Sequence, residues 1–417
     1  MHQPFSAQAI AELGRRAEAM LDELAAISAE PDRLVRLFLT PEHRRAADLV
    51  ALWMREAGLQ VSEDALGTLR GRSGEGPRLL LGSHIETVID AGRYDGTFGV
   101  VAAILAVEVL QRAQALPKFG IELLAFGDEE SSRFPTTLST SAAIAGHFAA
   151  KTLMLADADG VTYADALRAY GKDPAQIPAA AIKPGEALAY VEVHIEQGPV
   201  LEAQHQPLGI VTAMVGQTRL QLELKGETGH AGTVPMAARR DALTGAAEMA
   251  LLAETIARQA GDNLVATVGT IEAKPGAVNI IPGRVRFSLD LRAASDGARK
   301  AAVERFTREA RAIAGRRRLE IAITPIHEIA TTPCDRELQD QLALAVEAVG
   351  AKPVRLASGA AHDSMSMVKL CPIAMLFVRC RGGVSHNPAE YASPADMGLA
   401  IAALARFIEG FTFGSRG

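Results

Sequence analysis

The stretch GSHIETVIDAGRYDGTFGV, residues 82–100, decides the fold of this chain. It follows the aliphatic residues 79–81 and carries a histidine and two carboxylates within twelve positions, His84, Glu86 and Asp95. Glycines lie among these residues, so the loop can fold closely without steric conflict. An apolar strand, a glycine-rich loop and an apolar helix are typical of the first half of a βαβ unit.

The flanking segments continue this pattern and predict an α/β domain. Residues 78–84, 98–113 and 121–126 read as strand, helix and strand, with the continuous apolar runs of buried strands. We expect a mixed sheet that lies between helices. Further strands are expected at 189–194 and 373–378, and further helices at 7–27, 41–58, 335–349 and 394–411.

An inserted segment interrupts this domain. Its apolar spacing predicts, in order, a strand at 218–227, a helix at 239–259, strands at 264–273 and 283–292, a helix at 296–314 and a strand at 318–329. The order β-α-β-β-α-β is the ferredoxin-like arrangement. We therefore expect a main domain formed by 1–212 and 329–417, and an inserted α+β domain at 213–328 that acts as a lid.

Length and composition limit the classes of function. A chain of 417 residues exceeds the size of one hydrophobic core, so two domains are expected. The net charge is −6 and the longest basic run, GRRRLE, is short, which argues against nucleic-acid binding. No segment reads as a signal peptide or a membrane span, and the three cysteines show no CxxC spacing. We expect a reduced, cytoplasmic protein.

Side chains that can bind metals follow four of the predicted strands. The carboxyl ends of strands in an α/β sheet converge on one edge, where ligands bind. The donors are three imidazoles and several carboxylates without a thiolate, a set that suits Zn, Mn, Co or Ni. Two such ions can share one carboxylate, for which Asp95 is well placed, while one glutamate acts as a general base. The residues are His84, Asp95, Glu129, Glu130, His194 and His386.

The motifs occur in the order of a known family. They are HIET with YDGTFG, GDEESSRF, HIEQGPVLE, GHAGTVP, NIIPGRVRFSLDLR, SGAAHDSM and SHNPAEY. The chain resembles the aminoacylase and carboxypeptidase-type family of binuclear metallohydrolases over residues 40–412. Within that family it resembles the branch of N-carbamoyl-L-amino acid hydrolases, β-ureidopropionases and allantoate amidohydrolases. The resemblance implies a zinc-peptidase-like catalytic domain, with a lid that pairs two subunits into a homodimer.

The resemblance also implies roles for individual residues. One divalent metal ion would be held by His84, Asp95 and His194, and a second by Asp95, Glu130 and His386. Glu129 would take a proton from the attacking water molecule. The inserted domain would contribute His230 to stabilise the oxyanion, with Asn279 and Arg292 binding the substrate's amide oxygen and carboxylate. Gln197 and His362 would line the same pocket. For His362, a role in supporting the metal ligands is an equal alternative.

Glu86 departs from the family pattern. The first motif normally reads His-x-Asp, and the aspartate orients the metal-binding imidazole through its second ring nitrogen. We expect the longer side chain of Glu86 to accept the same hydrogen bond from His84.

The implied reaction is hydrolysis of a ureido C–N bond in a small carboxylate substrate. The segments GSHIETVIDAGRYDG and GDEESSRFPTTL resemble those of allantoate amidohydrolases more than those of the other enzymes in this branch. Allantoate is therefore the expected substrate. An N-carbamoyl-L-amino acid hydrolase or a β-ureidopropionase is the alternative within the branch. An alternative of another class is a binding protein that has lost turnover, against which the intact Glu129 and the five metal-ligand positions argue.

Overall fold

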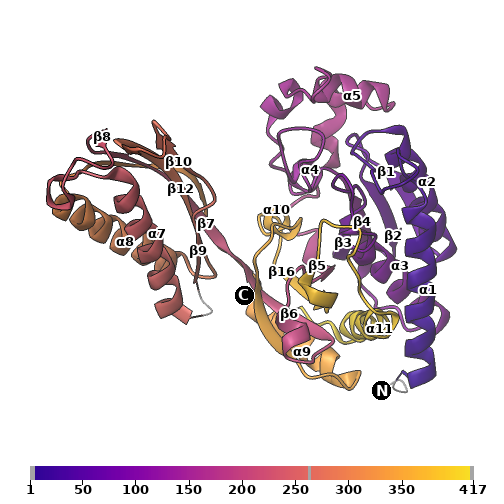
Figure 1. Ribbon diagram of the computed structural model, residues 1–417. Coiled ribbons are helices and arrows are strands. Elements are labelled where there is room, and N and C mark those ends of the chain that lie inside the picture. The colour runs from indigo at the N-terminus through magenta and orange to yellow at the C-terminus, as the bar shows by residue number, and fades with distance from the viewer. Residues whose placement is uncertain (1–4, 262–263, 414–417) are drawn as a thin grey trace. The chain divides into compact units, whose positions relative to one another are not determined.

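The chain folds into two compact units. The computed structural model describes residues 5–261 and 264–413. Unit 1 comprises Met1–Thr212 with Cys334–Gly417, and unit 2 comprises Ala213–Pro333 (Figure 1). The chain returns to unit 1 at Cys334. Just before it, the two-residue strand β14 (Thr332–Pro333) pairs with the last two residues of β6 (Leu208–Met214), the strand on which the chain leaves unit 1.

Unit 1 is built on a mixed sheet in the order β1-β2-β4-β3-β5-β16-β6-β14, with β15 paired to β6. The central strands β4, β3, β5 and β16 are parallel, and β2 and β6 add to them antiparallel. All four parallel strands therefore present their carboxyl ends at one edge. The remaining bounds are β1 (Gln60–Glu63), β2 (Leu69–Ser73), β3 (Arg78–His84), β4 (Gly120–Phe126), β5 (Ala187–Ile195), β15 (Val354–Ser358) and β16 (Ile373–Val378).

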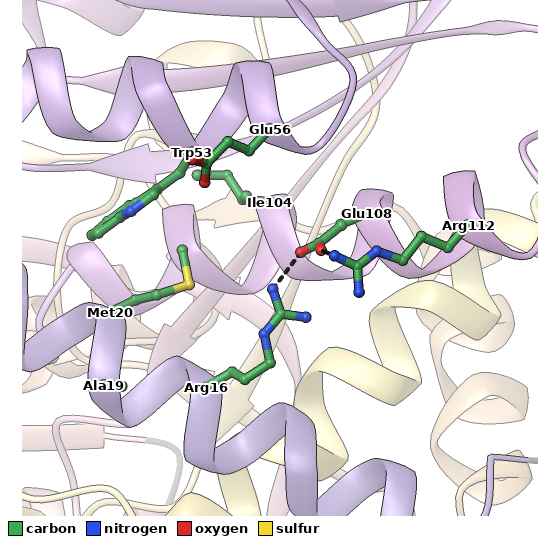
Figure 2. Close-up of a pocket in the computed structure, with 8 residues that line it drawn as sticks. All are labelled: Arg16, Ala19, Met20, Trp53, Glu56, Ile104, Glu108 and Arg112. Carbon is green, nitrogen blue, oxygen red and sulfur yellow. Dashed lines mark hydrogen bonds and ion pairs between the residues drawn. The ribbon is translucent and has the colours of Figure 1, made fainter.

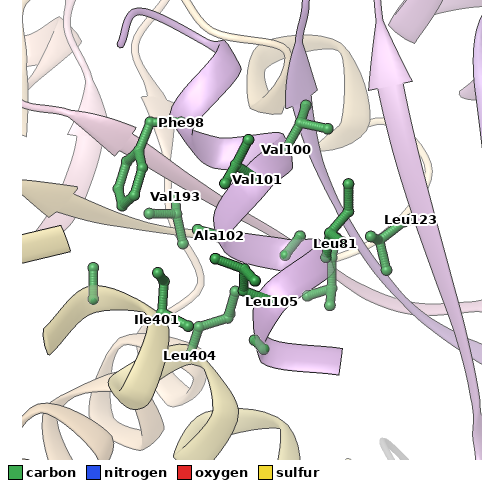
Figure 3. Packing of buried hydrophobic residues seen from close by; sticks show 14 of the residues in the cluster. Leu81, Phe98, Val100, Val101, Ala102, Leu105, Leu123, Val193, Ile401 and Leu404 are labelled. Atoms are coloured by element: carbon green, nitrogen blue, oxygen red, sulfur yellow. The ribbon is translucent and has the colours of Figure 1, made fainter. Parts of the chain in front are cut away.

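The central helix of unit 1 is α3 (Thr97–Arg112), which is buried on nearly all sides. Figure 3 shows its residue Leu105 between the strand residue Leu81 and Leu404 of α11. A helix covered on both sides needs no polar face, which explains the run of apolar residues after Phe98. The other helices are α1 (Ala7–Ala25), α2 (Pro41–Glu56), α4 (Ser139–Ile144), α5 (Tyr163–Ala169), α6 (Val200–Ala203), α9 (Arg336–Ala348), α10 (Ser364–Met367) and α11 (Pro394–Gly410), with short 3-10 helices at Ala150–Met154, Pro174–Ala180 and Arg381–Gly383.

Unit 2 has the ferredoxin-like strand order β10-β12-β7-β13, with neighbouring strands antiparallel and β9 also paired to β12. Two helices, α7 and α8, pack on this sheet around Met249 and Phe306. The bounds are β7 (Gly216–Lys225), β8 (Gly229–His230), a 3-10 helix (Met236–Ala238), α7 (Ala242–Ala260), β9 (Leu264–Thr267), β10 (Ile271–Lys274), β11 (Ile280–Ile281), β12 (Arg284–Ala293), α8 (Asp296–Arg316) and β13 (Glu320–Ile329).

Two boundaries in unit 2 differ from the sequence prediction. The single strand expected at 264–273 is two strands, because Thr270 leaves the ladder and its amide donates to the Ser288 hydroxyl. The helix expected from residue 239 begins at Ala242, because the Asp241 carboxylate caps it by accepting from the amides of Leu243 and Thr244. Within the described residues, no helix combines the length and apolarity needed to cross a membrane.

A substitution at Gly99 tests how closely α3 lies on the sheet. A Cβ at Gly99 would come within 2.1 Å of the Val193 carbonyl oxygen of β5, a backbone atom that cannot turn aside. We expect Gly99→Ala to lower the free energy of unfolding by about 1–3 kcal/mol. Gly410→Ala, at the end of α11 with open space around it, is the control and should be neutral or slightly stabilising. Denaturant unfolding of both variants checks this, and equal stability would contradict the close packing.

Candidate metal centre

The predicted ligands meet at the carboxyl edge of the parallel strands. His84 ends β3, His194 lies near the end of β5, and Glu129 and Glu130 follow β4. Asp95 lies in the loop before α3, and His386 lies in the loop after β16. The side chains of this set are buried except that of His386, which is half exposed. Strand order and the loops after the strands therefore bring together residues that are far apart in the sequence.

The first cluster consists of His84, Asp95 and His194. Asp95 Oδ1 lies 3.2 Å from His194 Nε2 and 3.9 Å from His84 Nε2. The second ring nitrogens face main-chain carbonyls, with His194 Nδ1 at 2.9 Å from Ile195 O and His84 Nδ1 at 3.2 Å from Glu86 O. Such contacts hold each ring so that Nε2 is presented to a metal ion.

The second cluster consists of Asp95, Glu130 and His386. His386 Nε2 lies 3.2 Å from Asp95 Oδ2 and 3.4 Å from Glu130 Oε2. Each oxygen of Asp95 thus faces a different cluster. The ligand atoms of each cluster lie within 4.8 Å of one another, a spacing that suits a divalent ion.

Buried charge at this edge fits cations. Burial raises the pKa of Asp95, but the imidazoles of His194 and His386 hold it well below its usual range. Burial and the neighbouring Asp95 raise the pKa of Glu130 to about 7. Burial, then the carboxylates of Glu130 and Asp363, raises the pKa of Glu129 well above its usual value. Asp95 Oδ1 is buried without a hydrogen bond from the described residues. Divalent ions would satisfy this orphaned oxygen and the crowded carboxylates.

The loop that carries Asp95 is held by two residues that the sequence analysis did not single out. Glu390 Oε1 accepts hydrogen bonds from the amides of Tyr94 and Asp95, at 2.9 and 3.1 Å. The Ser385 hydroxyl lies 2.9 Å from both Asp95 Oδ2 and Glu390 Oε2. Both residues belong to the quoted motif SHNPAEY, so the signal was present, but no pattern in the chain ties them to a loop some 290 residues earlier.

Gly96 makes the close approach of this loop feasible. Its φ is +64°, a conformation that favours glycine, and a Cβ there would meet the ring of His84 at 2.3 Å. Gly96 therefore leaves room for the imidazole beside Asp95.

The predicted hydrogen bond from His84 to the Glu86 carboxylate is wrong. The carboxylate does not accept a hydrogen bond from His84, because Oε1 lies 3.7 Å from His84 Nδ1, beyond hydrogen-bonding distance. The main-chain carbonyl of Glu86 takes that position instead, at 3.2 Å. Oε1 of Glu86 accepts from the amides of Glu129 and Glu130, at 2.5 and 3.3 Å.

Gln197 and His362 also lie beside the clusters. The Gln197 amide donates to Asp95 Oδ2 at 2.8 Å, and its backbone has a φ of +55°. His362 is buried behind His194, with ring centroids 4.5 Å apart, and its Nε2 lies 2.8 Å from the Ser358 hydroxyl. His362 is therefore enclosed by protein in this structure, which fits the supporting role left open above.

The three residues predicted on the inserted domain belong to unit 2. His230 and Asn279 are neighbours, because β8 pairs with β11 and the Ala231 amide donates to Asn279 O at 2.9 Å. Both side chains are exposed. Arg292 lies on β12, where its guanidinium contacts Asp290 at 3.2 Å.

Comparison with known proteins agrees with this arrangement. Residues 80–410 match the model of peptidase family M20/M25/M40. The chain belongs to this family. It is 40% identical over 428 residues to an allantoate deiminase of Arabidopsis thaliana, covering 94% of this chain and 81% of that protein. It is also 40% identical over 388 residues to an N-carbamoyl-L-amino acid amidohydrolase of Geobacillus stearothermophilus, covering 92% and 95%.

A solved structure shows the same fold. The crystal structure of a hydantoinase/carbamoylase family amidase from Burkholderia ambifaria superposes with a TM-score of 0.88 at 34% identity, covering 95% of this chain and 96% of that one. The predicted family, its fold of a mixed sheet between helices, the hydrolase class and the metal dependence are thereby confirmed.

Asp95 offers the sharpest test of the metal centre, because one oxygen faces each cluster. We expect Asp95→Asn to lose most of its affinity for Zn²⁺ or Mn²⁺ at both clusters, and to lose the rise in melting temperature that these ions give the metal-free protein. Metal content by elemental analysis and melting curves check this. His205→Asn, at an exposed histidine outside both clusters, is the control and should bind metal normally. Unchanged stoichiometry in Asp95→Asn would contradict the shared ligand.

Proposed function

We propose that this chain cleaves the ureido C–N bond of a small carboxylate substrate, with allantoate as the preferred substrate, and releases ammonia and carbon dioxide. The observation that carries the proposal is the buried Glu129 beside two metal-ligand clusters, in a chain 40% identical to an allantoate deiminase. The equal identity to an N-carbamoyl-L-amino acid amidohydrolase supports such amino acids as the second candidate.

Two divalent ions held by the clusters would polarise the ureido oxygen and make water a stronger acid. The residues of the chain itself would transfer protons and orient the substrate. The Glu129 carboxylate makes no hydrogen bond to any described residue, and one of its oxygens lies within 4.8 Å of ligand atoms of His84 and Glu130. As the proposed general base, Glu129 accepts the proton of the attacking water and donates it to the leaving nitrogen.

Further roles are proposed for unit 2. His230 and Asn279, adjacent through β8 and β11, can donate hydrogen bonds to oxygen atoms that gain negative charge in the transition state. Arg292 has the planar fork that pairs with a carboxylate. Its partner Asp290, on the same face of β12, can hold the guanidinium in place before substrate binds.

We further propose a homodimer that works in the cytoplasm. Unit 2 exposes large apolar side chains that a second copy can cover: Leu251, Val265, Ile271, Val278 and Ile326. Strand β13 lies at the edge of its sheet, where a second copy can pair. The three cysteines are free and buried, which fits a reducing compartment.

Ammonia release tests the reaction and separates the candidates. We expect the protein loaded with Mn, Co, Zn or Ni to release more ammonia from allantoate than from N-carbamoyl-L-amino acids or N-carbamoyl-β-alanine. Glu129→Gln should lower kcat by roughly 10²–10⁴-fold while metal content stays at the wild-type level. If metal-loaded wild-type protein bound allantoate without releasing ammonia, a binding protein would replace the proposed enzyme.

Arg292→Ala tests recognition of the substrate carboxylate. We expect KM for carboxylate substrates to rise by roughly 10–100-fold, because truncating one partner of a charge pair costs about 2 kcal/mol or more. Arg286→Ala, an exposed arginine on the same strand, is the matched control and should leave KM unchanged. An equal loss with uncharged ureas would contradict the assigned role.

A further inference from the structure

The side chain of Glu86 makes hydrogen bonds that its position in the HIET motif does not explain. It is buried, with 1% of its surface exposed, in the segment that leaves β3. One carboxylate oxygen accepts from two consecutive amides, those of Glu129 and Glu130, 43 and 44 residues later. These are the proposed general base and a proposed ligand of the second cluster.

The contact between Glu86 and His84 does not use the Glu86 carboxylate. The imidazole Nδ1 lies closer to the main-chain carbonyl of Glu86 than to its side chain, at 3.2 against 3.7 Å. Any residue at position 86 supplies that carbonyl. The orientation of His84 is therefore set without the side chain, and the length of the side chain serves another contact.

The segment on which Glu86 stands is fixed by Arg36. This guanidinium, buried to 1% exposure, donates to the Ile85 carbonyl at 2.8 Å. The main chain of Arg36 pairs with residue 87, donating to the Thr87 hydroxyl and accepting from the Thr87 amide, both at 3.0 Å. The backbone on both sides of Glu86 is held, so a shorter side chain could not reach the same amides by a shift of the segment.

The peptide of Glu129 is held from its other side as well. The Thr137 hydroxyl donates to the Glu129 carbonyl oxygen. Asp128, just before it, has a left-handed backbone with φ +62°, which turns the chain after β4. Because its amide and its carbonyl both take part in hydrogen bonds, the backbone of Glu129 is fixed, and this limits where its carboxylate can lie.

We propose that Glu86 is a positioning residue that holds the Glu129–Glu130 backbone and thereby aims the general base at the metal clusters. An aspartate would be shorter by one carbon–carbon bond, about 1.5 Å, and would not reach. The inference rests on the proposed role of Glu129. Glu390 does the same for the loop of the shared ligand, since one of its oxygens accepts from the amides of Tyr94 and Asp95.

Two substitutions of Glu86 separate the effect of side-chain length from that of side-chain charge. Glu86→Gln keeps the length and one acceptor oxygen but removes the charge, whereas Glu86→Asp keeps the charge and restores the residue usual in the motif. We expect Glu86→Gln to retain most activity. Glu86→Asp should lose roughly 10–100-fold in kcat at saturating metal, with KM within about twofold of wild type. If Glu86→Asp is as active as Glu86→Gln or more so, the proposal is overturned.

A second readout needs no catalysis. In metal-free Glu86→Asp we expect faster amide hydrogen exchange in the peptide that spans residues 127–133, and wild-type exchange there in Glu86→Gln. Equal exchange in both variants and wild type would count against the proposal. If Glu86→Asp does not fold, Thr137→Val frees the carbonyl of the same peptide and should lower kcat with KM kept; an unchanged kcat overturns the proposal.

Glu129→Gln distinguishes this inference from the proposed function. If that variant keeps wild-type turnover, the assignment of the base fails, and the present inference fails with it. If it is inactive while Glu86→Asp matches wild type, only the positioning role of Glu86 fails.

Discussion

The structure depends on one carboxylate, Asp95, being shared between two groups of ligands. Its two oxygens face different clusters, and both clusters need it. A short side chain can do this only if its backbone comes very close to the imidazole of His84, which is where Gly96 stands. The tight loop and the glycine at position 96 meet that geometric demand.

Main-chain amides keep the acidic residues of the centre in place. Glu390 accepts from the amides beside Asp95, and Glu86 accepts from those of Glu129 and Glu130. Amide donors fix a buried carboxylate without adding a competing cation. The protein thus anchors these loops through backbone contacts, and Asp95 Oδ1 is left without a hydrogen bond from the described residues. By contrast, a pocket of about 390 Å³ in unit 1 lies away from this edge. It is lined by residues of α1, α2 and α3, and there Arg16 and Arg112 pair with Glu108 (Figure 2).

Much of the fold and of the centre followed from local patterns. Apolar runs of strand length, helical spacing and the β-α-β-β-α-β order located both units, because burial leaves a periodic record in the sequence. That these residues gather at one edge could be predicted because most of them follow a strand, and parallel strands end at the same edge. The contacts of Glu86, Ser385 and Glu390 could not, since they depend on side-chain length and loop path at distances of a few ångströms.

The sequence by itself determined the family, the α/β class, the inserted unit and the identity of the residues that gather at the sheet edge. These are properties of residue type and spacing, which survive small shifts of the backbone. Only the tertiary structure decided that the carbonyl of Glu86 orients His84 while its carboxylate holds Glu129, and that Glu390 supports Asp95. Hydrogen bonds form or fail within a few tenths of an ångström, and that precision arises only when the packed chain fixes both partners.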